Sequence, residues 1–264
     1  DGTSMKLRVA VGQMRSTEDL RANYQIIQDL LAISRQRKAK LLILPECALT
    51  GYGPAVYDGP HRFDERGFKQ VLDDVRQAAA EARIAVVAGT AVKQAKGWMD
   101  AAVLVGTNGK ICGRYDKAHL YGEDTRYYLP GGRAKVHRIL ETRLGMQICF
   151  DLRFPEPFRD LALRCAQVIA VPANICGTDG MWKGPVIEAH VRSRAAENGR
   201  YVVFANAAGP DQNVASMVAD PRGEILARTS LDRAEVLTVD LDLARVDNGL
   251  LRARRVDLSK LVFS

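Results

Sequence analysis

Short apolar runs alternate with amphipathic segments of helical periodicity along this chain, and two hairpins interrupt the alternation. The apolar runs are typical of buried strands and cover residues 7–13, 41–44, 84–90, 144–148, 168–172, 201–207 and 235–241. Helical periodicity follows at 20–34, 68–82 and 186–198, while the turns Asn108-Gly109 and Asp220–Gly223 indicate hairpins. A simple parallel sheet would lack those hairpins. The pattern therefore predicts an α/β fold with two mixed sheets facing each other and helices outside, a four-layer α-β-β-α sandwich.

The chain has the length and apolar content for one large core. It contains 264 residues, 47% of them hydrophobic, and has no internal repeat or linker. We expect a single domain over residues 5–264, with residues 1–4 as an expression remnant ahead of a natural start at Met5. The amphipathic, basic tail at 242–264 is expected to pack on the body or on a partner subunit.

Charge and cysteine usage argue against several classes of protein. The net charge of +7 is spread along most of the chain and aromatic residues make up only 6%, so nucleic-acid binding is not favoured. The five cysteines are irregularly spaced without a CxxC pair, which predicts neither a disulfide framework nor a metal site and fits the cytoplasm. No apolar run is long enough to span a bilayer, and no signal-peptide region begins the sequence, so no membrane partner is expected.

Three chemically active side chains each follow the end of a predicted strand. Glu46 comes after the strand that ends at Pro45, Lys117 follows the second strand of the first hairpin, and Cys149 follows the run at 144–148. Cys149 also stands where the chain turns from a strand toward a helix, a position that exposes a nucleophile and places backbone N–H groups near it. Because the ends of neighbouring strands meet at one sheet edge, these side chains are expected to share a pocket.

The three residue types fit one reaction. A thiol is only slightly ionised at neutral pH and needs a base or a cation to activate it. Glu46 would take the thiol proton, pass it to a leaving amine and then activate water, and burial would raise its pKa for that work. Lys117 would favour the thiolate and stabilise an oxyanion together with the backbone N–H of Phe150.

Each of these residues also has an ordinary structural interpretation. Cys149 could be a core residue, because cysteine is among the most buried residue types. Glu46 could cap a helix or lie solvated in a loop, and Lys117 could be a surface lysine. His119 could pair with the cysteine or could be a structural histidine hydrogen-bonded in its loop. Spacing alone leaves these alternatives open.

At these residues the chain resembles the nitrilase superfamily, the carbon–nitrogen hydrolases. The segment LLILPECALTGY at 41–52 looks like the family's glutamate motif, GRYDKAHLYG at 113–122 like its lysine motif, and LGMQICFDLRFPE at 144–156 like its cysteine motif. A weaker agreement is VPAN at 171–174. The three motifs occur in the family's order, and the resemblance covers nearly the whole chain.

The resemblance implies a fold, a reaction and an assembly. It implies the α-β-β-α sandwich and a catalytic triad of Glu46, Lys117 and Cys149. It also implies hydrolysis of a non-peptide C–N bond through a thioester, without metal or organic cofactor, by a homodimer or larger homo-oligomer. We expect a small amide substrate that yields ammonia and a carboxylate. A nitrile or N-carbamoyl amine, or a catalytically weak scaffold of the same fold, is the alternative.

Many members of that family carry a second glutamate six residues before a Pro-Gly or similar pair. Counting back from Pro130 gives Asp124, with Glu123 beside it, so the second acid is expected at Asp124 first and Glu123 second.

The resemblance also implies that three more residues brace the pocket, namely Tyr52, Arg153 and Asn174. For Tyr52 and Arg153 the alternative interpretation is structural, with Arg153 paired to a nearby acid such as Glu156.

Overall fold

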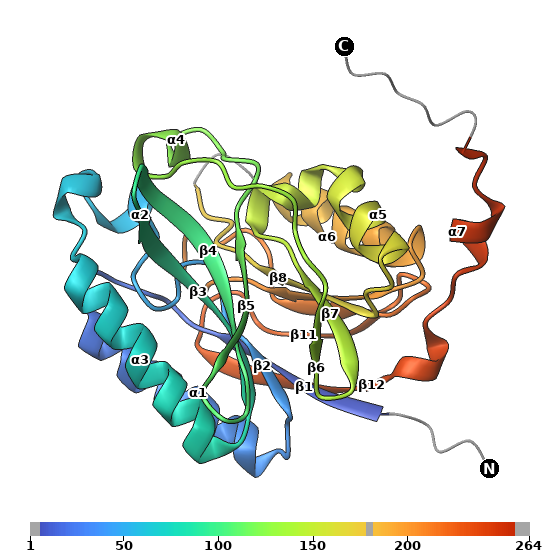
Figure 1. Cartoon of the computed structure of the whole chain (residues 1–264), viewed down its shortest axis with the longest axis horizontal. Helices are drawn as coiled ribbons and strands as arrows, with labels where there is room; N and C mark the ends of the chain where they lie inside the picture. Colours follow the sequence, from blue (N-terminus) through green and yellow to red (C-terminus); the bar gives the residue numbers. More distant parts are fainter. Residues whose placement is uncertain (1–5, 178–181, 257–264) are drawn as a thin grey trace.

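The computed structural model describes residues 6–177 and 182–256. Two six-stranded mixed sheets pack face to face, and helices cover their outer faces (Figure 1). This arrangement confirms the predicted α/β sandwich. The long helices α1 and α3 lie on one side of the molecule, and α5 and α6 lie on the other.

The first sheet has the strand order β12-β1-β2-β3-β4-β5. Its central strands β1, β2 and β3 are parallel, whereas the β12, β4 and β5 pairings are antiparallel. The strands are β1 (Lys6–Gln13), β2 (Leu41–Ile43), β3 (Ala85–Gln94), β4 (Gly97–Val105), β5 (Ile111–Asp116) and β12 (Glu235–Asp242).

The second sheet repeats this plan with the order β11-β10-β9-β8-β7-β6. Here β7, β8 and β9 are parallel, and antiparallel strands flank them on both sides. The strands are β6 (His137–Ile139), β7 (Thr142–Met146), β8 (Val168–Pro172), β9 (Tyr201–Ala205), β10 (Met217–Ala219) and β11 (Ile225–Arg228).

The helices form the two outer layers and several short connections. The outer helices are α1 (Leu20–Gln36), α3 (Glu65–Ala82), α5 (Pro155–Leu163) and α6 (Lys183–Ala196). Asp19 caps α1 by accepting hydrogen bonds from the backbone N–H groups of Arg21 and Ala22. The short helices are α2 (Gly53–Val56), α4 (Asp124–Tyr127) and α7 (Gly249–Ala253), with 3-10 turns η1 (Pro60–Arg62), η2 (Cys149–Arg153) and η3 (Leu243–Arg245).

The main core lies between the two sheets. Val9 and Val87 of the first sheet pack in one cluster with Met146 and Val171 of the second, all almost completely buried. A second cluster joins α1 and α3 to the outer face of the first sheet. The central strands are therefore covered on both faces, which explains why they appear in the sequence as continuous apolar runs.

The chain after β12 begins by packing against the body. Leu243 is buried, and the backbone carbonyl of Asp247 accepts a hydrogen bond from Arg200. No residue of α7 is buried. The beginning and end of the chain, at 1–5 and 257–264, lie outside the described residues, as does part of the predicted tail. Among the described residues, no helix has the length and apolar character needed to cross a membrane.

Gly89 in β3 allows the turn after β2 to lie directly across the sheet. A Cβ atom at this position would lie 2.1 Å from the carbonyl oxygen of Pro45 and 2.8 Å from the Cα of Glu46. Both are backbone atoms, so neither could move aside without shifting the turn. The absence of a side chain at residue 89 therefore allows the backbone of Pro45 and Glu46 to lie in direct contact with β3.

We expect Gly89→Ala to lower the free energy of unfolding by about 2 kcal/mol, because the added methyl group overpacks this contact. Urea unfolding of the purified variants measures the change. Gly132→Ala is the matched control, since a Cβ there would meet nothing within 4 Å. Equal stabilities of the two variants would show that the close approach is not a constraint.

Candidate active site

Lys117 lies at the centre of a fully buried charge cluster. It follows β5, and its Nζ lies 2.5 Å from Oε1 of Glu46 and 2.6 Å from Oδ2 of Asp124. A third carboxyl oxygen, Oδ2 of Asp100 in β4, lies 3.4 Å away. None of the four side chains is exposed. The structure therefore brings together two of the predicted catalytic residues with Asp124, the first-choice second acid.

A tight turn after β2 positions Glu46. The backbone N–H of Glu46 donates to the carbonyl of Ala173 at 3.4 Å, and Leu49 donates to Gly89 at 3.1 Å. Cys47, directly after Glu46, has a φ of +50°, in the left-handed region that non-glycine residues seldom adopt. The turn is thus held against both sheets, so the carboxyl group cannot swing out into solvent.

Asp124 is held by three donors. Besides Lys117, the hydroxyl of Tyr52 and the backbone N–H of Tyr121, at 2.9 Å, donate to its carboxylate. Glu123, the other acid considered from the sequence, lies exposed and pairs with Arg126 at 2.6 Å. Of the two neighbouring acids, Asp124 faces the lysine and Glu123 faces solvent.

Cys149 begins the 3-10 turn η2 after β7. Its φ is +45°, and its side chain is 7% exposed. Strained backbone of this kind is common at functional sites. The buried Asp151 fixes the turn by accepting a hydrogen bond from the backbone N–H of Ile148 at 3.0 Å. The nucleophile candidate therefore stands on a rigid turn with access to solvent on one side.

Asp151 also ties this turn to the lysine loop. It accepts the hydroxyl of Tyr115 at 2.8 Å and the backbone N–H of His119 at 2.9 Å, and its Oδ1 lies 2.7 Å from Nδ1 of His119. The His119 ring stacks on Phe154 at a centroid distance of 3.9 Å. His119 thus takes part in a structural network, as one of the two sequence interpretations proposed.

The charged groups around Lys117 change the pKa of the Cys149 thiol. Burial raises the pKa of Cys149 well above its ordinary value, and the Glu46 carboxylate adds to this, while Lys117 and a backbone hydrogen bond from Asn174 oppose it. The cysteine is therefore a neutral thiol at rest. Lys117 favours the thiolate, as the sequence suggested, but burial and the Glu46 carboxylate outweigh its effect on the pKa of Cys149.

The pKa values of Glu46 and of Lys117 are both raised. Burial raises the pKa of Glu46 well above its usual range, and the carboxyls of Asp100 and Asp124 add to this against the opposing charge of Lys117. Burial acts to lower the pKa of Lys117, but the surrounding carboxyls outweigh it and raise that pKa well above its ordinary value. Lys117 is therefore a permanent cation here, and Glu46 is a carboxyl that binds a proton more readily than an ordinary glutamate does.

A cavity of about 130 Å³ opens above Cys149. Arg153 lines it, with its guanidinium 5.6 Å from the ring centroid of Trp182 and Nη1 3.4 Å from Nε2 of His190. The side chain of Asn174 accepts a hydrogen bond from Gln212 at 3.0 Å. The remaining described residues of the wall are mostly apolar or aromatic and include Tyr52, Tyr121, Phe150, Ile175 and Ile187. All three predicted bracing residues thus line the same cavity as the thiol.

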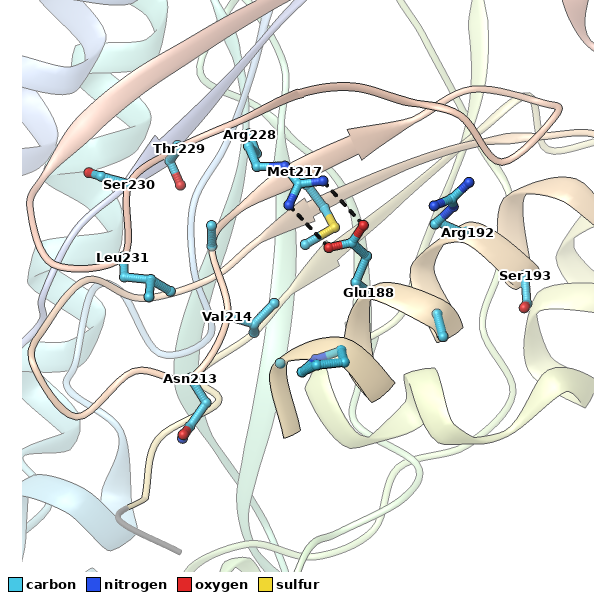
Figure 2. Close-up of a pocket in the computed structure, with 14 residues that line it drawn as sticks. Glu188, Arg192, Ser193, Asn213, Val214, Met217, Arg228, Thr229, Ser230 and Leu231 are labelled. Carbon is cyan, nitrogen blue, oxygen red and sulfur yellow. Dashed lines mark hydrogen bonds and ion pairs between the residues drawn. The ribbon is translucent and has the colours of Figure 1, made fainter. Parts of the chain in front are cut away.

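A larger groove, of about 840 Å³, lies between α6 and the strands β10 and β11. Figure 2 shows that its charged residues Glu188 and Arg228 point at each other, and both contacts measure 3.1 Å. Thr229 is likewise engaged, through a hydrogen bond to Gln13. The larger groove therefore offers paired groups, whereas the smaller cavity is lined by a thiol on which the buried Glu46 and Lys117 act electrostatically.

Within residues 6–177 and 182–256, no group of three or more His, Cys, Asp or Glu side chains is placed to hold a metal ion. The clustered carboxyls of this site surround an ammonium group instead.

Sequence reasoning missed Asp100 and Asp151. Asp100 is the one charged residue in the otherwise apolar and buried strand GWMDAAVLV, a signal that could have marked it. Asp151 lies inside the cysteine motif, but nothing local in the sequence indicates that it binds the loop containing His119.

Comparison with known proteins identifies the family. The sequence profile of the family called carbon-nitrogen hydrolase matches residues 8–249. A protein named nitrilase from Pyrococcus abyssi is 33% identical over 235 residues, which cover 86% of each chain. An (R)-stereoselective amidase from a Pseudomonas species is 32% identical over 230 residues, which cover 83% of this chain and 81% of that one.

Solved structures of an amidase from Nesterenkonia sp. AN1 share the fold. A double mutant in complex with acrylamide superposes with a TM-score of 0.86 at 25% identity, covering 98% of this chain and 97% of that one. In another structure of that amidase, with a TM-score of 0.85 at 26% identity and covering 96% of this chain and 95% of that one, the acetamide moiety of fluoroacetamide is covalently added at the active-site cysteine. Fold, motifs and relatives agree, and the chain belongs to the carbon–nitrogen hydrolase family, in its nitrilase and amidase branch.

Proposed function

We propose that this enzyme hydrolyses a small carboxylic amide at Cys149 through a thioester, releasing ammonia and a carboxylate. The observation that carries the proposal is the buried Glu46 carboxyl, bonded to Lys117 and acting electrostatically on the Cys149 thiol. The related amidase supports it, because its active-site cysteine is the residue to which the acetamide moiety of fluoroacetamide was covalently added.

The first step couples proton removal to attack. Because the Cys149 thiol is neutral at rest, its sulfur attacks the amide carbon as Glu46 accepts the thiol proton. The S–H bond breaks, an O–H bond forms on Glu46, and an S–C bond forms to the substrate. Lys117 and the backbone N–H of Phe150 stabilise the negative oxygen of the tetrahedral intermediate.

The following steps return the proton. The intermediate collapses with cleavage of the C–N bond, and Glu46 gives its proton to the leaving nitrogen, so ammonia departs. Glu46 then removes a proton from water as the water oxygen attacks the thioester carbon. The S–C bond breaks, Glu46 returns this proton to the sulfur, and the carboxylic acid leaves and ionises to the carboxylate by losing its proton to solvent. Asp124 keeps Lys117 in place during these steps, because it bonds both Lys117 and Tyr52.

The cavity favours a short substrate. Its volume of about 130 Å³ is well below that of sites that bind drug-sized ligands. Its aromatic and aliphatic wall suits a small aliphatic group beside the reacting amide. Assembly into a homo-oligomer and a cytoplasmic location remain predictions from the sequence.

Cys149→Ala is expected to abolish ammonia release, because no other group replaces the attacking sulfur. The measurement is ammonia production across short aliphatic amides, amides of dicarboxylates, N-carbamoyl amines and nitriles. Cys112→Ala is the matched control, since Cys112 is exposed on β5 and should leave activity intact. Ammonia release that persists in Cys149→Ala would contradict the assignment. A wild type inactive on the whole panel with an unreactive Cys149 would favour the scaffold alternative.

The acidic limb of kcat/KM is expected to lie above the ordinary glutamate pKa of about 4.3. Burial raises the pKa of Glu46, and protonated Glu46 cannot accept the thiol proton, so activity falls as the pH drops through that raised pKa. Glu46→Gln should reduce kcat by roughly 10²–10⁴-fold at every pH. A pH series of kcat/KM measures this. An acidic limb at or below the ordinary value would show that Glu46 is not the buried base.

A further inference from the structure

A cavity of about 620 Å³ lies apart from the one above Cys149, and the proposed reaction gives it no role. Its wall comes from the end of β5 and the residues that follow, from the residue after β7, from the loop at 132–134 and from the start of α5. Among the described residues, the two cavities have no lining residue in common. It is named the Gln147 cavity after the residue that follows β7.

Gln147 is a buried polar residue of this wall whose amide lacks partners. Its side chain is completely buried, and its Nε2 has no hydrogen-bond partner among the described residues. Its Oε1 lies 3.2 Å from the hydroxyl of Tyr115, but that hydroxyl has a single proton and lies closer, at 2.8 Å, to the Asp151 carboxylate. The amide of Gln147 therefore makes at most one hydrogen bond within the described part of the protein.

Another completely buried glutamine, Gln13, shows the usual outcome. Its Nε2 donates to two backbone carbonyls, and its Oε1 accepts from the hydroxyls of Ser216 and Thr229. Buried side-chain amides are normally satisfied in this way, because a buried donor without an acceptor is costly. Gln147 departs from this rule at a position where it lines a cavity.

His119 brings a second polar group to the same cavity. Its Nδ1 lies 2.7 Å from Oδ1 of Asp151, and a carboxylate can only accept, so Nδ1 carries the proton of the neutral ring. This leaves Nε2 as an acceptor, which has no partner in the described part of the chain. Tyr115 and Asp151 connect His119 to Gln147 through successive contacts of 2.7, 2.8 and 3.2 Å. The two groups thus belong to one fixed network.

The charged groups of the wall are paired, with one exception. Asp160 accepts from Arg133 at 3.1 Å and also from Arg164. Glu156 is exposed and forms no ion pair with any described residue, although the sequence suggested it as a partner for Arg153. The cavity therefore offers the donor of Gln147, the acceptors of His119 and Glu156, and one unpaired negative charge.

These groups discriminate among ligand chemistries. An ammonium group would pair with Glu156 but leave the Gln147 donor without an acceptor. A carboxylate would accept from Gln147 but face the negative charge of Glu156. A primary carboxamide has a carbonyl acceptor and N–H donors on one group and carries no charge, so it matches all three.

We propose that the Gln147 cavity is a second binding site, which takes the primary carboxamide end of a small and otherwise apolar molecule. The amide oxygen accepts from Gln147, and the amide NH₂ donates to His119 or Glu156. The rest of the ligand packs on the apolar part of the wall, which is formed by Ala118, Ala134, Phe154 and Pro157. Binding at this site does not require the proposed reaction, because Cys149 does not line the cavity.

An NMR titration of the full-length ¹⁵N-labelled Cys149→Ala protein with benzamide tests the site, since this variant lacks the attacking sulfur and should not consume the amide. The backbone signal of Ala118 reports on the Gln147 cavity, and that of Ile175 reports on the cavity above residue 149. The Gln147 side-chain NH₂ signal is identified by its absence from Gln147→Leu. We expect the Ala118 and Gln147 signals to shift together along one binding curve. No shift of either signal up to the solubility limit of benzamide would overturn the proposal.

Gln147→Leu is expected to raise the dissociation constant measured at Ala118 by about tenfold, because the amide loses its buried partner. Any change at Ile175 should be the same as in the wild-type background. Gln94→Leu is the matched control, since Gln94 is exposed at the end of β3 and should leave binding unchanged. An unchanged constant in Gln147→Leu would show that Gln147 does not hold the ligand.

Gly132→Phe provides a second variant if Gln147→Leu does not fold. Gly132 lines the cavity, and a Cβ there would meet nothing within 4 Å, so the ring can extend into open space and obstruct the ligand. We expect Gly132→Phe to abolish the benzamide shift at Ala118 and Gly132→Ala to retain it. A shift that persists in Gly132→Phe would contradict binding in this cavity.

Benzoate and benzylamine test the class of ligand, because they carry a carboxylate or an ammonium group on the same ring. Both should bind at Ala118 at least tenfold more weakly than benzamide. Equal or tighter binding of either compound would overturn the assignment to a carboxamide.

Discussion

The ammonium of Lys117 among three buried carboxyls is the interaction on which the site depends. Burying charged groups is unfavourable unless they are paired in good geometry, and here one cation holds acids from three separate segments. Glu46 follows β2, Asp100 belongs to β4 and Asp124 begins α4. A single side chain thus fixes the turn, the strand and the loop relative to each other. The Glu46 carboxyl has a defined position because the Lys117 ammonium does.

The Cys149 thiol follows β7 of the second sheet, so it meets the cluster around Lys117 only when the two sheets pack together. Two connections align the halves. The backbone N–H of Glu46 donates to Ala173 at the end of β8, and Asp151 beside the cysteine accepts hydrogen bonds from Tyr115 and His119. The apolar core between the sheets sets the distance over which these polar contacts reach. A few buried hydrogen bonds therefore link the packing of the two sheets to the position of Cys149 relative to Glu46 and Lys117.

The sequence predicted the elements and the strand ends better than it predicted the cluster. Apolar runs bounded by Pro45 and by the turn at Cys149 located the sandwich strands, because strands buried on both faces have a clear pattern. The motifs suggested Asp124, but its three donors depend on the loop path and not on local sequence. Asp100 could not be placed, because a polar residue inside a strand indicates neither which face it occupies nor what lies opposite. The left-handed backbone at Cys149 likewise depends on the tertiary contacts that hold the turn.

The free energy of unfolding of Lys117→Met as a function of pH tests the central role of the ammonium most directly. At neutral pH we expect a loss of about 3–5 kcal/mol, because the acids are left without their cation. Without the cation, the pKa values of Glu46 and Asp100 rise further above those of the unfolded chain. The folded state then binds protons more tightly, and the deficit shrinks as the pH falls. Lys110→Met, at an exposed position, is the control. A loss below about 1 kcal/mol that does not vary with pH would contradict the account, because that is the magnitude of an exposed ion pair.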